Sequence, residues 1–497
     1  MCRFLSFILL WLLVPAPSEA AWRVAESAHF RVYGEMSVDD LRKRVELLED
    51  YRGLLGMFTN AKVADDAPKL TIYLVNVIAT AVPFGTISDS TAGFYNAGDR
   101  GIAAYAEKGD FGQKALLHEY AHHYMFASTG RIYPAWYVEG FAEYFMTATL
   151  QPKRVEFGLF DNGRASSLQE PLWLPWEQVL GRNYARMGSE DRYKFYAQSW
   201  LLTHYLFRMP GMREKLAAHL AAIAKGSDPL SAFTAHVEPD LKALSRKLRA
   251  YTAGRNFTFS RLERAPPVPA PVTVRDLPAS ADDVLMYYAW LDNRGGAKDP
   301  AAALARIKAA TARHPGDALA QRTLAMAELY LGDAGKALPL IDGLLAAAPE
   351  DADLLRLKAE ALLEMNRDIN RGDARRLLVR AVKADPADWR SMHVYLHTHD
   401  IINNAVPDSL FDVVQVMWQL APQASGIVID MANVLVRKGR LADAARVLEP
   451  VAFTPHGSSA SGFARQLRDA ALSGDAAAYV KLWQAGLPIV VDMPQVK

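Results

Sequence analysis

Apolar and polar residues follow two different periods along the first half of the chain. Short runs rich in β-branched and aromatic residues predict strands at residues 29–33 and 70–75. Between them, residues 37–58 carry apolar side chains at helical spacing and are expected to form an amphipathic helix. Two further runs, residues 93–95 and 101–105, flank an Asn-Ala-Gly-Asp turn and predict a hairpin. The pattern therefore predicts an α+β fold for this half.

A proline-rich stretch separates this half from the remainder. Five prolines occur among the fifteen residues from Ala265 to Ala279: Pro266, Pro267, Pro269, Pro271 and Pro278. Because proline lacks a backbone donor and favours extended geometry, residues 256–281 are expected to form a linker. This linker would join a first domain, residues 21–255, to a second domain, residues 282–485.

The second half is predicted to be all-α and repetitive. Prolines that would close helices recur at intervals of 34, 37, 36 and 33 residues, at Pro315, Pro349, Pro386, Pro422 and Pro455. The run from Gly332 to Ala337 is matched at the same offset by the run from Gly439 to Ala444. Residues 282–456 resemble the tetratricopeptide repeat, in which the glycine ends one helix and the alanine lets the next helix pack closely. The resemblance implies an array that binds a protein partner or substrate, and an unspecialised helical bundle is the alternative.

Residues 1–20 have the pattern of a secretory signal peptide. Arg3 precedes eleven apolar residues, 4–14, and Ser-Glu-Ala at 18–20 matches a small-x-small cleavage site. An uncleaved membrane anchor is the alternative, but this apolar run is shorter than the about 20 residues that span a bilayer. The mature chain is therefore expected to begin at Ala21, to have no membrane span, and to be exported to a periplasm or out of the cell.

Composition limits the chemistry that the mature chain can use. The 497 residues include 56 Lys and Arg against 55 Asp and Glu, and this balance gives no support to binding of nucleic acid or of an anionic membrane. The only cysteine, Cys2, lies in the signal-like segment. A metal would therefore have to be bound by histidine and carboxylate, without thiolate.

One segment carries a metal-binding pattern. From Asp110 onward the chain is expected to be helical, and His118-Glu119-Tyr120-Ala121-His122 lies in this helix. Two histidines four residues apart lie on one helix face, about 6 Å apart along the axis, which suits two imidazoles that converge on one zinc ion. The glutamate between them can take a proton from the water that such a metal activates. The sequence thus predicts His118 and His122 as ligands and Glu119 as general base.

A catalytic zinc ion needs a third protein ligand, which leaves one position open. Glu139 follows in the run from Trp136 to Phe145, whose sequence is WYVEGFAEYF. Here the chain resembles the gluzincin metallopeptidases, most closely the peptidase-MA-like family with EGxAEY after the zinc helix. The resemblance covers residues 27–250 and implies a zincin-like fold, one zinc ion per chain and Glu139 as the third ligand. Because Val138 stands where aminopeptidases have asparagine, the choice between endopeptidase and exopeptidase action stays open.

Three further expectations concern the surroundings of this set. As in thermolysin-like enzymes, Glu143 would orient a ligand histidine through its other ring nitrogen, and a solvated helix carboxylate is the alternative. Tyr196 is the first candidate for the donor to the developing oxyanion, although core packing explains the tyrosines there equally well. Gluzincins also bind substrate along a sheet edge beside the zinc helix, and residues 101–105 are either this edge or an internal strand.

Three other histidines are expected to stay outside the ligand set. His123 points about 100° away from His122 around the helix, off the metal face. His29 and His204 are isolated in apolar surroundings, where packed or hydrogen-bonded histidines are commoner than ligands.

The sequence favours an exported zinc metallopeptidase whose second domain binds a partner or substrate. A non-catalytic scaffold with a degenerate peptidase domain is the alternative, but such a protein has no physical need to keep Glu119. A zinc hydrolase that acts on a non-peptide bond also stays open, because the motif fixes activation of water and not the bond attacked.

Overall fold

The computed structural model describes residues 22–59, 67–84, 87–88, 91–129, 132–169, 172–182, 184, 187–253, 258–293, 297–401, 405–454 and 459–491. Within these residues the fold is mostly helical, with a small mixed sheet. The signal-like segment, Cys2 and Pro455 lie outside the described residues. No helix in the described part of the chain is both long and apolar enough to span a bilayer.

The first half is built on a six-stranded sheet. Its strands lie in the order β4 (Gly93–Ala97), β5 (Ile102–Glu107), β3 (Leu70–Val75), β2 (Phe30–Gly34), β1 (Arg23–Glu26) and β9 (Thr273–Asp276). Strands β5, β3 and β2 are parallel, and the other pairings are antiparallel. The expected strands and hairpin are all present. Of the two alternatives left open for residues 101–105, the internal strand is correct: β5 lies between β4 and β3, and β4 is the edge.

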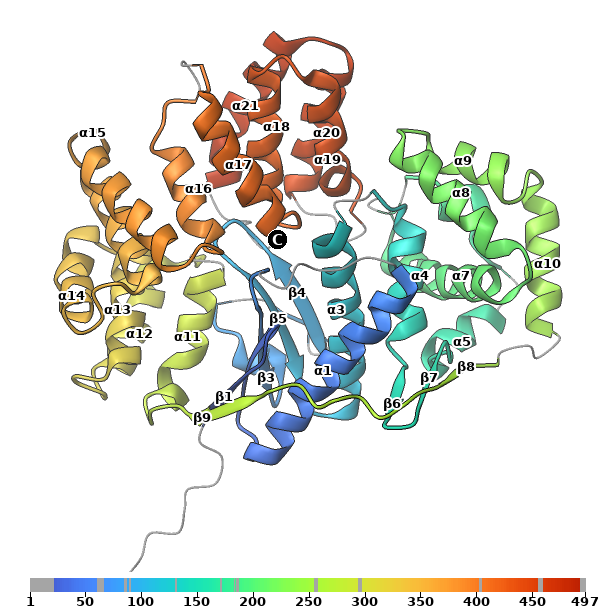
Figure 1. Ribbon diagram of the computed structural model, residues 1–497, viewed down its shortest axis with the longest axis horizontal. Coiled ribbons are helices and arrows are strands. Elements are labelled where there is room, and N and C mark those ends of the chain that lie inside the picture. The colour runs from blue at the N-terminus through green and yellow to red at the C-terminus, as the bar shows by residue number, and fades with distance from the viewer. Residues whose placement is uncertain are drawn as a thin grey trace, which may run out of the picture.

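Two helices cover one face of this sheet, α1 (Val38–Thr59) and α3 (Asp110–Thr129), as Figure 1 shows. The amphipathic pattern of α1 buries Leu41, Val45 and Leu48 against Ile72 and Leu74 of β3, within the largest core of the chain. The short helix α2 (Ile78–Ala81) follows β3. The expected helices at residues 37–58 and from Asp110 onward are confirmed.

The opposite face of the sheet carries a row of stacked rings. Tyr33, Tyr73, Tyr105 and Phe94 stack across four strands, with centroid distances of 5.0, 5.1 and 4.6 Å between successive rings. Helix α11 (Ala281–Asn293) covers this row, and the Tyr105 hydroxyl donates to the Ala289 carbonyl. The first helix of the second half therefore completes the core of the first half.

Helices and a small second sheet follow α3. The helices are α4 (Ala135–Phe145), α5 (Asn162–Gln169), α6 (Trp176–Leu180), α7 (Ser189–Arg208), α8 (Met212–Ala224), α9 (Pro229–His236) and α10 (Leu241–Ala253). The second sheet is antiparallel, with β7 (Arg154–Phe157) between β6 (Thr149–Gln151) and β8 (Ser260–Glu263). Helix α4 packs between α3 and α7, so the helix that carries Glu139 lies beside the helix that carries His118 and His122.

The proline-rich segment is extended, as expected, but its ends are strands of the first half. Strand β8 pairs with β7 and strand β9 pairs with β1, so the segment runs as a strap between the two sheets (Figure 1). Between these strands, Arg264 donates from Nη2 to Asp50 Oδ2 on α1 over 2.6 Å. The segment expected to be a linker, residues 256–281, is thus paired with strands of the first half and does not run free between two domains.

The second half continues as antiparallel helices. They are α12 (Pro300–Thr311), α13 (Ala318–Leu331), α14 (Ala334–Ala347), α15 (Ala352–Ala384), α16 (Trp389–His397), α17 (Asp408–Leu420), α18 (Ser425–Arg437), α19 (Leu441–Ala452), α20 (Ser459–Leu472) and α21 (Ala476–Val491). Asn366 interrupts α15 with non-helical backbone angles, so α15 is two helices joined at a kink. Figure 1 shows α16 to α21 above α3 and the end of β4.

The residues that repeat in sequence lie at corresponding helix ends, with the glycine one position later relative to its helix in the second copy. Gly332 is the C-cap of α13, and Gly439 follows α18 with φ +74°, a left-handed angle that glycine adopts without strain. Ala337 of α14 and Ala444 of α19 are fully buried. The four repeated prolines among the described residues all lie between helices: Pro315, Pro349, Pro386 and Pro422.

Candidate metal centre

Two helices bring the predicted ligands together. Leu116, Leu117 and Ala121 of α3 are buried in the core, which fixes the rotation of the helix so that His118 and His122 face α4. Every residue of α4 from Ala135 to Phe145 is buried. Glu139 therefore reaches the two histidines from a helix that has no solvent-facing side.

The three side chains converge at their ligand atoms. His118 Nε2 lies 3.0 Å from His122 Nε2 and 3.3 Å from Glu139 Oε2, and His122 Nε2 lies 3.4 Å from the same oxygen. The side chain of Glu139 is fully buried, whereas that of His118 is 11% exposed. The cluster is thus reached from solvent on the His118 side.

This triangle fits a tetrahedral zinc ion. Ligand atoms about 2.0–2.1 Å from zinc at tetrahedral angles lie about 3.3 Å from one another. The observed separations of 3.0, 3.3 and 3.4 Å agree with that edge length. Two imidazoles and one carboxylate are also a donor set that zinc favours, and three protein ligands leave one position open.

Glu119 lies beside the cluster on α3 and is half-buried. Its carboxylate is near enough for its charge to act on His118 and on Tyr95 of β4. Burial lowers the pKa of His118, but the Glu139 carboxylate and the charges of Glu143 and Glu119 outweigh burial and raise that pKa to about 9. The three carboxylates therefore favour a positive charge at His118.

Glu143 lies one turn beyond Glu139 on α4. Its Oε1 lies 3.6 Å from His118 Nδ1, the ring nitrogen that faces away from the ligand triangle, and Glu143 is 1% exposed. This is the position from which a carboxylate orients a ligand histidine. The alternative of a solvated helix carboxylate is excluded by its burial.

Tyr196 of α7 is also at the centre. Its ring centroid lies 6.2 Å from that of His118, and its hydroxyl lies 2.9 Å from the hydroxyl of Tyr184. Tyr196 is half-buried, as suits a residue at the rim of a site. Tyr184, which sequence reasoning did not single out, is a second phenol at the same place, and only the fold brings it there.

The remaining histidines make other contacts. His123 faces Tyr95, whose hydroxyl lies 3.0 Å from His123 Nδ1, and burial lowers the pKa of His123 to about 4. His29 Nδ1 lies 2.8 Å from Glu49 Oε2. His204 Nδ1 lies 2.8 Å from the Tyr251 hydroxyl. All three lie outside the ligand triangle, as the sequence predicts.

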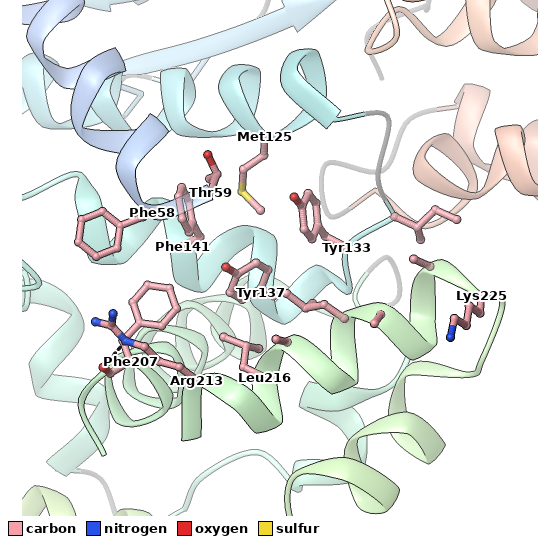
Figure 2. Close-up of a pocket in the computed structure, with 15 residues that line it drawn as sticks. Phe58, Thr59, Met125, Tyr133, Tyr137, Phe141, Phe207, Arg213, Leu216 and Lys225 are labelled. Carbon is pink, nitrogen blue, oxygen red and sulfur yellow. Dashed lines mark hydrogen bonds between the residues drawn. The ribbon is translucent and has the colours of Figure 1, made fainter. Parts of the chain in front are cut away.

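A cavity of about 590 Å³ lies near the centre but does not include it. Figure 2 shows Tyr137 and Phe141 of α4 and Met125 of α3 pointing into it. Positions 137 and 141 are each two residues from Glu139, on the opposite side of α4. The cavity is lined mainly by apolar side chains, and the predicted ligands and Glu119 are not among its lining residues.

Comparison with known proteins adds little to this picture. No family model and no curated protein matches the sequence. Among solved structures, the chain is similar to "MamA RS-1 ArsTM double mutant", with 21% identity, 35% of this chain and 94% of that chain covered, and a TM-score of 0.26. A likeness this weak assigns neither a fold nor a function, so the geometry of the centre must support any functional proposal.

Proposed function

We propose that this protein is a zinc metallopeptidase of gluzincin type, with His118, His122 and Glu139 as the metal ligands. The observation that carries the proposal is the convergence of their three ligand atoms, with separations of 3.0–3.4 Å, next to Glu119. A bound zinc ion would supply Lewis acidity to the attacking water and to the scissile carbonyl group.

The protein's own groups supply the proton transfers. Glu119 takes a proton from the attacking water at its carboxylate and returns it to the leaving amine. Tyr196 or its neighbour Tyr184 donates a hydroxyl hydrogen bond to the oxyanion that develops at the carbonyl. Glu143 holds the His118 ring in the orientation that keeps Nε2 toward the other ligands.

An extended substrate fits the sheet edge at β4. This strand is the outer strand of the six-stranded sheet and packs on α3, the helix that carries both histidines. Gly93 allows that close packing, because a β-carbon there would meet the Ala115 side chain at 2.9 Å. A peptide that adds to β4 by backbone pairing would lie beside the centre.

The second half is proposed to be a tetratricopeptide-like array that recruits a partner or the substrate. The matched positions of Gly332 with Gly439, and of Ala337 with Ala444, support this proposal. Export, with cleavage before Ala21, is also part of the proposal, and the N-terminal sequence of the protein recovered from the producing cells tests it.

Hydrolysis of a quenched-fluorescence peptide library by the Glu119→Gln variant tests the proposal. The variant should keep its zinc but lose hydrolysis by a factor of about 10² or more, because it removes the proton acceptor and no ligand. Glu364→Gln, an exposed change on α15, is the matched control and should hydrolyse as the unaltered chain does. Equal hydrolysis by Glu119→Gln would point to a different base, whereas absence of hydrolysis by the unaltered, zinc-loaded chain would favour the scaffold alternative.

A further inference from the structure

The helical half contains a second cluster of histidine and carboxylate. His393 and His397 lie one turn apart on α16, with the same spacing as His118 and His122, and both face Asp430 of α18. Their Nε2 atoms lie 3.1 and 2.9 Å from Asp430 Oδ2. The two rings meet edge to face, with centroids 4.7 Å apart.

The burial of this cluster sets it apart from a surface ion pair. Asp430 is 0% exposed, and its second oxygen, Oδ1, has no hydrogen-bond partner among the described residues. Asn433, one turn further along α18, is also fully buried, and neither polar atom of its side chain is hydrogen-bonded within the described part of the chain. Buried polar atoms without partners are costly, so a group that occupies this place is expected.

A second carboxylate approaches from the first half. The backbone N–H of Gly426 donates to Asp99 Oδ1 over 2.7 Å, and Asp99 lies in the turn between β4 and β5. Its charge acts on both His393 and His397. Gly426 is required for this approach, because a β-carbon there would overlap the Asp99 carboxylate. Gly426 and Asp430 are four residues apart on α18, so both face the hairpin.

We propose that His393, His397 and Asp430 bind a second divalent cation. The expected ion is zinc, because zinc prefers imidazole together with carboxylate as ligands. The nitrogen-to-oxygen separations of 2.9 and 3.1 Å are close to the about 3.3 Å expected between ligands of a tetrahedral zinc ion. Asp99 stands outside this group of ligand atoms. The ion would join α16 to α18, next to the Asp99–Gly426 hydrogen bond that ties α18 to the β4–β5 turn.

This site is structural and has no catalytic base. Val394 occupies the place after His393 that Glu119 occupies after His118, so α16 offers no carboxylate between its two histidines to take a proton. In the absence of a metal, His397 Nε2 would simply donate to Asp430 Oδ2, with His393 Nε2 beside the same oxygen, as a clasp between two helices. The two arrangements differ in one measurable respect, which is the binding of metal.

Zinc content of the full-length chain, resupplied with zinc and dialysed, separates the two sites. The unaltered protein should carry about two zinc ions per chain, Glu139→Gln and Asp430→Asn about one each, and the double variant about none. His397→Gln should match Asp430→Asn, whereas His399→Gln, a change two residues further along the chain, should keep both ions.

Thermal unfolding gives a second readout that does not depend on hydrolysis. Zinc should raise the Tm of Glu139→Gln, in which only the second site remains, and should leave the Tm of the double variant unchanged. A folded Glu139→Gln variant that takes up no zinc and shows no shift in Tm would overturn the second site. If instead Asp430→Asn loses its zinc and Glu139→Gln keeps it, the second site is upheld and the proposed catalytic centre is contradicted.

Discussion

The α-carbon of Gly140 lies directly against the backbone carbonyl group of Ser199, so closely that a β-carbon at position 140 would lie well inside 3.0 Å of it. Helices α4 and α7 therefore pack backbone against backbone at this point. Glu139 immediately precedes Gly140 on α4, so this close approach sets how far its carboxylate reaches toward His118 and His122. The glycine of the EGxAEY run thus has a packing reason.

Gly140→Ala should accordingly weaken both the fold and the metal centre. The added methyl group forces α4 away from α7, which should cost about 1–3 kcal/mol of unfolding free energy and lower zinc affinity. Urea unfolding and zinc titration measure the two effects. Gly343→Ala on the exposed side of α14, where a β-carbon meets nothing within 4 Å, is the matched control and should stabilise the chain by up to about 1 kcal/mol. Equal effects of the two changes would contradict the packing argument.

Glu143→Gln should reduce zinc affinity without removing a ligand. The charge that faces His118 Nδ1 at 3.6 Å is lost, and with it the electrostatic preference for one orientation of the ring. The expected decrease is about 10- to 100-fold, as for other residues that orient metal ligands. Competition with a chelator of known affinity measures it, with Glu364→Gln as control, and an unchanged affinity would show that Glu143 has only a packing role.

The hydroxyls of Tyr196 and Tyr184, 2.9 Å apart, make distinct predictions. If Tyr196 donates to the oxyanion, Tyr196→Phe should lower kcat by about 10²-fold with little change in KM, because the contact strengthens in the transition state. Tyr184→Phe should then have a smaller effect, through the orientation of Tyr196. The opposite ranking in steady-state kinetics would assign the donor role to Tyr184.

Arg390 joins three helices through charge. It donates to Asp292 of α11 over 2.8 Å and to Asp353 of α15 over 2.6 Å. Arg390→Met should cost about 1–3 kcal/mol of unfolding free energy, because two half-buried carboxylates lose their shared cation. Arg376→Met, which breaks an exposed pair with Asp373, should cost less than about 1 kcal/mol. Chemical denaturation of both variants tests the difference.

Acid should destabilise the first half through buried histidines. Burial lowers the pKa of His204 and of His219 to about 4, below the ordinary value of 6.5. Because the unfolded chain takes up these protons at higher pH, the stability that the neutral rings contribute is complete above pH 6.5 and is lost as the pH falls toward 4. Each histidine should contribute a loss of about 2 kcal/mol between pH 7 and 5.

Denaturation of His219→Gln at these two pH values isolates one of the two contributions. The variant should show a smaller loss of stability on acidification than the unaltered chain. His236→Gln, at an exposed position, should change the pH dependence less than His219→Gln does, because the charge of His236 is only a minor cause of the lowered pKa of His219. A pH dependence that His219→Gln also leaves unchanged would contradict the assignment.

Local patterns allowed most of the centre to be predicted. Residues 37–58 became α1 with bounds shifted by one residue, and the spacing of His118 and His122 placed both on one face of α3. Glu139 required the family resemblance, because its approach depends on the turn between α3 and α4. What the sequence did not reveal depends on distant pairing: β9 joins β1, and α11 covers the sheet.

The second cluster shows where local reasoning stops. His393 and His397 have the same spacing as the first pair, and this signal was present in the sequence. Without a glutamate between them it does not suggest catalysis, and Asp430 lies 33 residues further along the chain on another helix. Only the packing of α18 beside α16 brings the carboxylate to the pair.

Restoring zinc to the chelator-stripped chain tests the central claim most directly, with hydrolysis of the quenched-fluorescence peptide library as the measurement. Asp430→Asn is the chain to use, because it leaves only the proposed catalytic site to be filled. The account predicts no hydrolysis by the stripped chain and full recovery at about one equivalent of zinc. Hydrolysis that persists in the stripped chain, or that stays absent when one zinc ion is bound per chain, would contradict it.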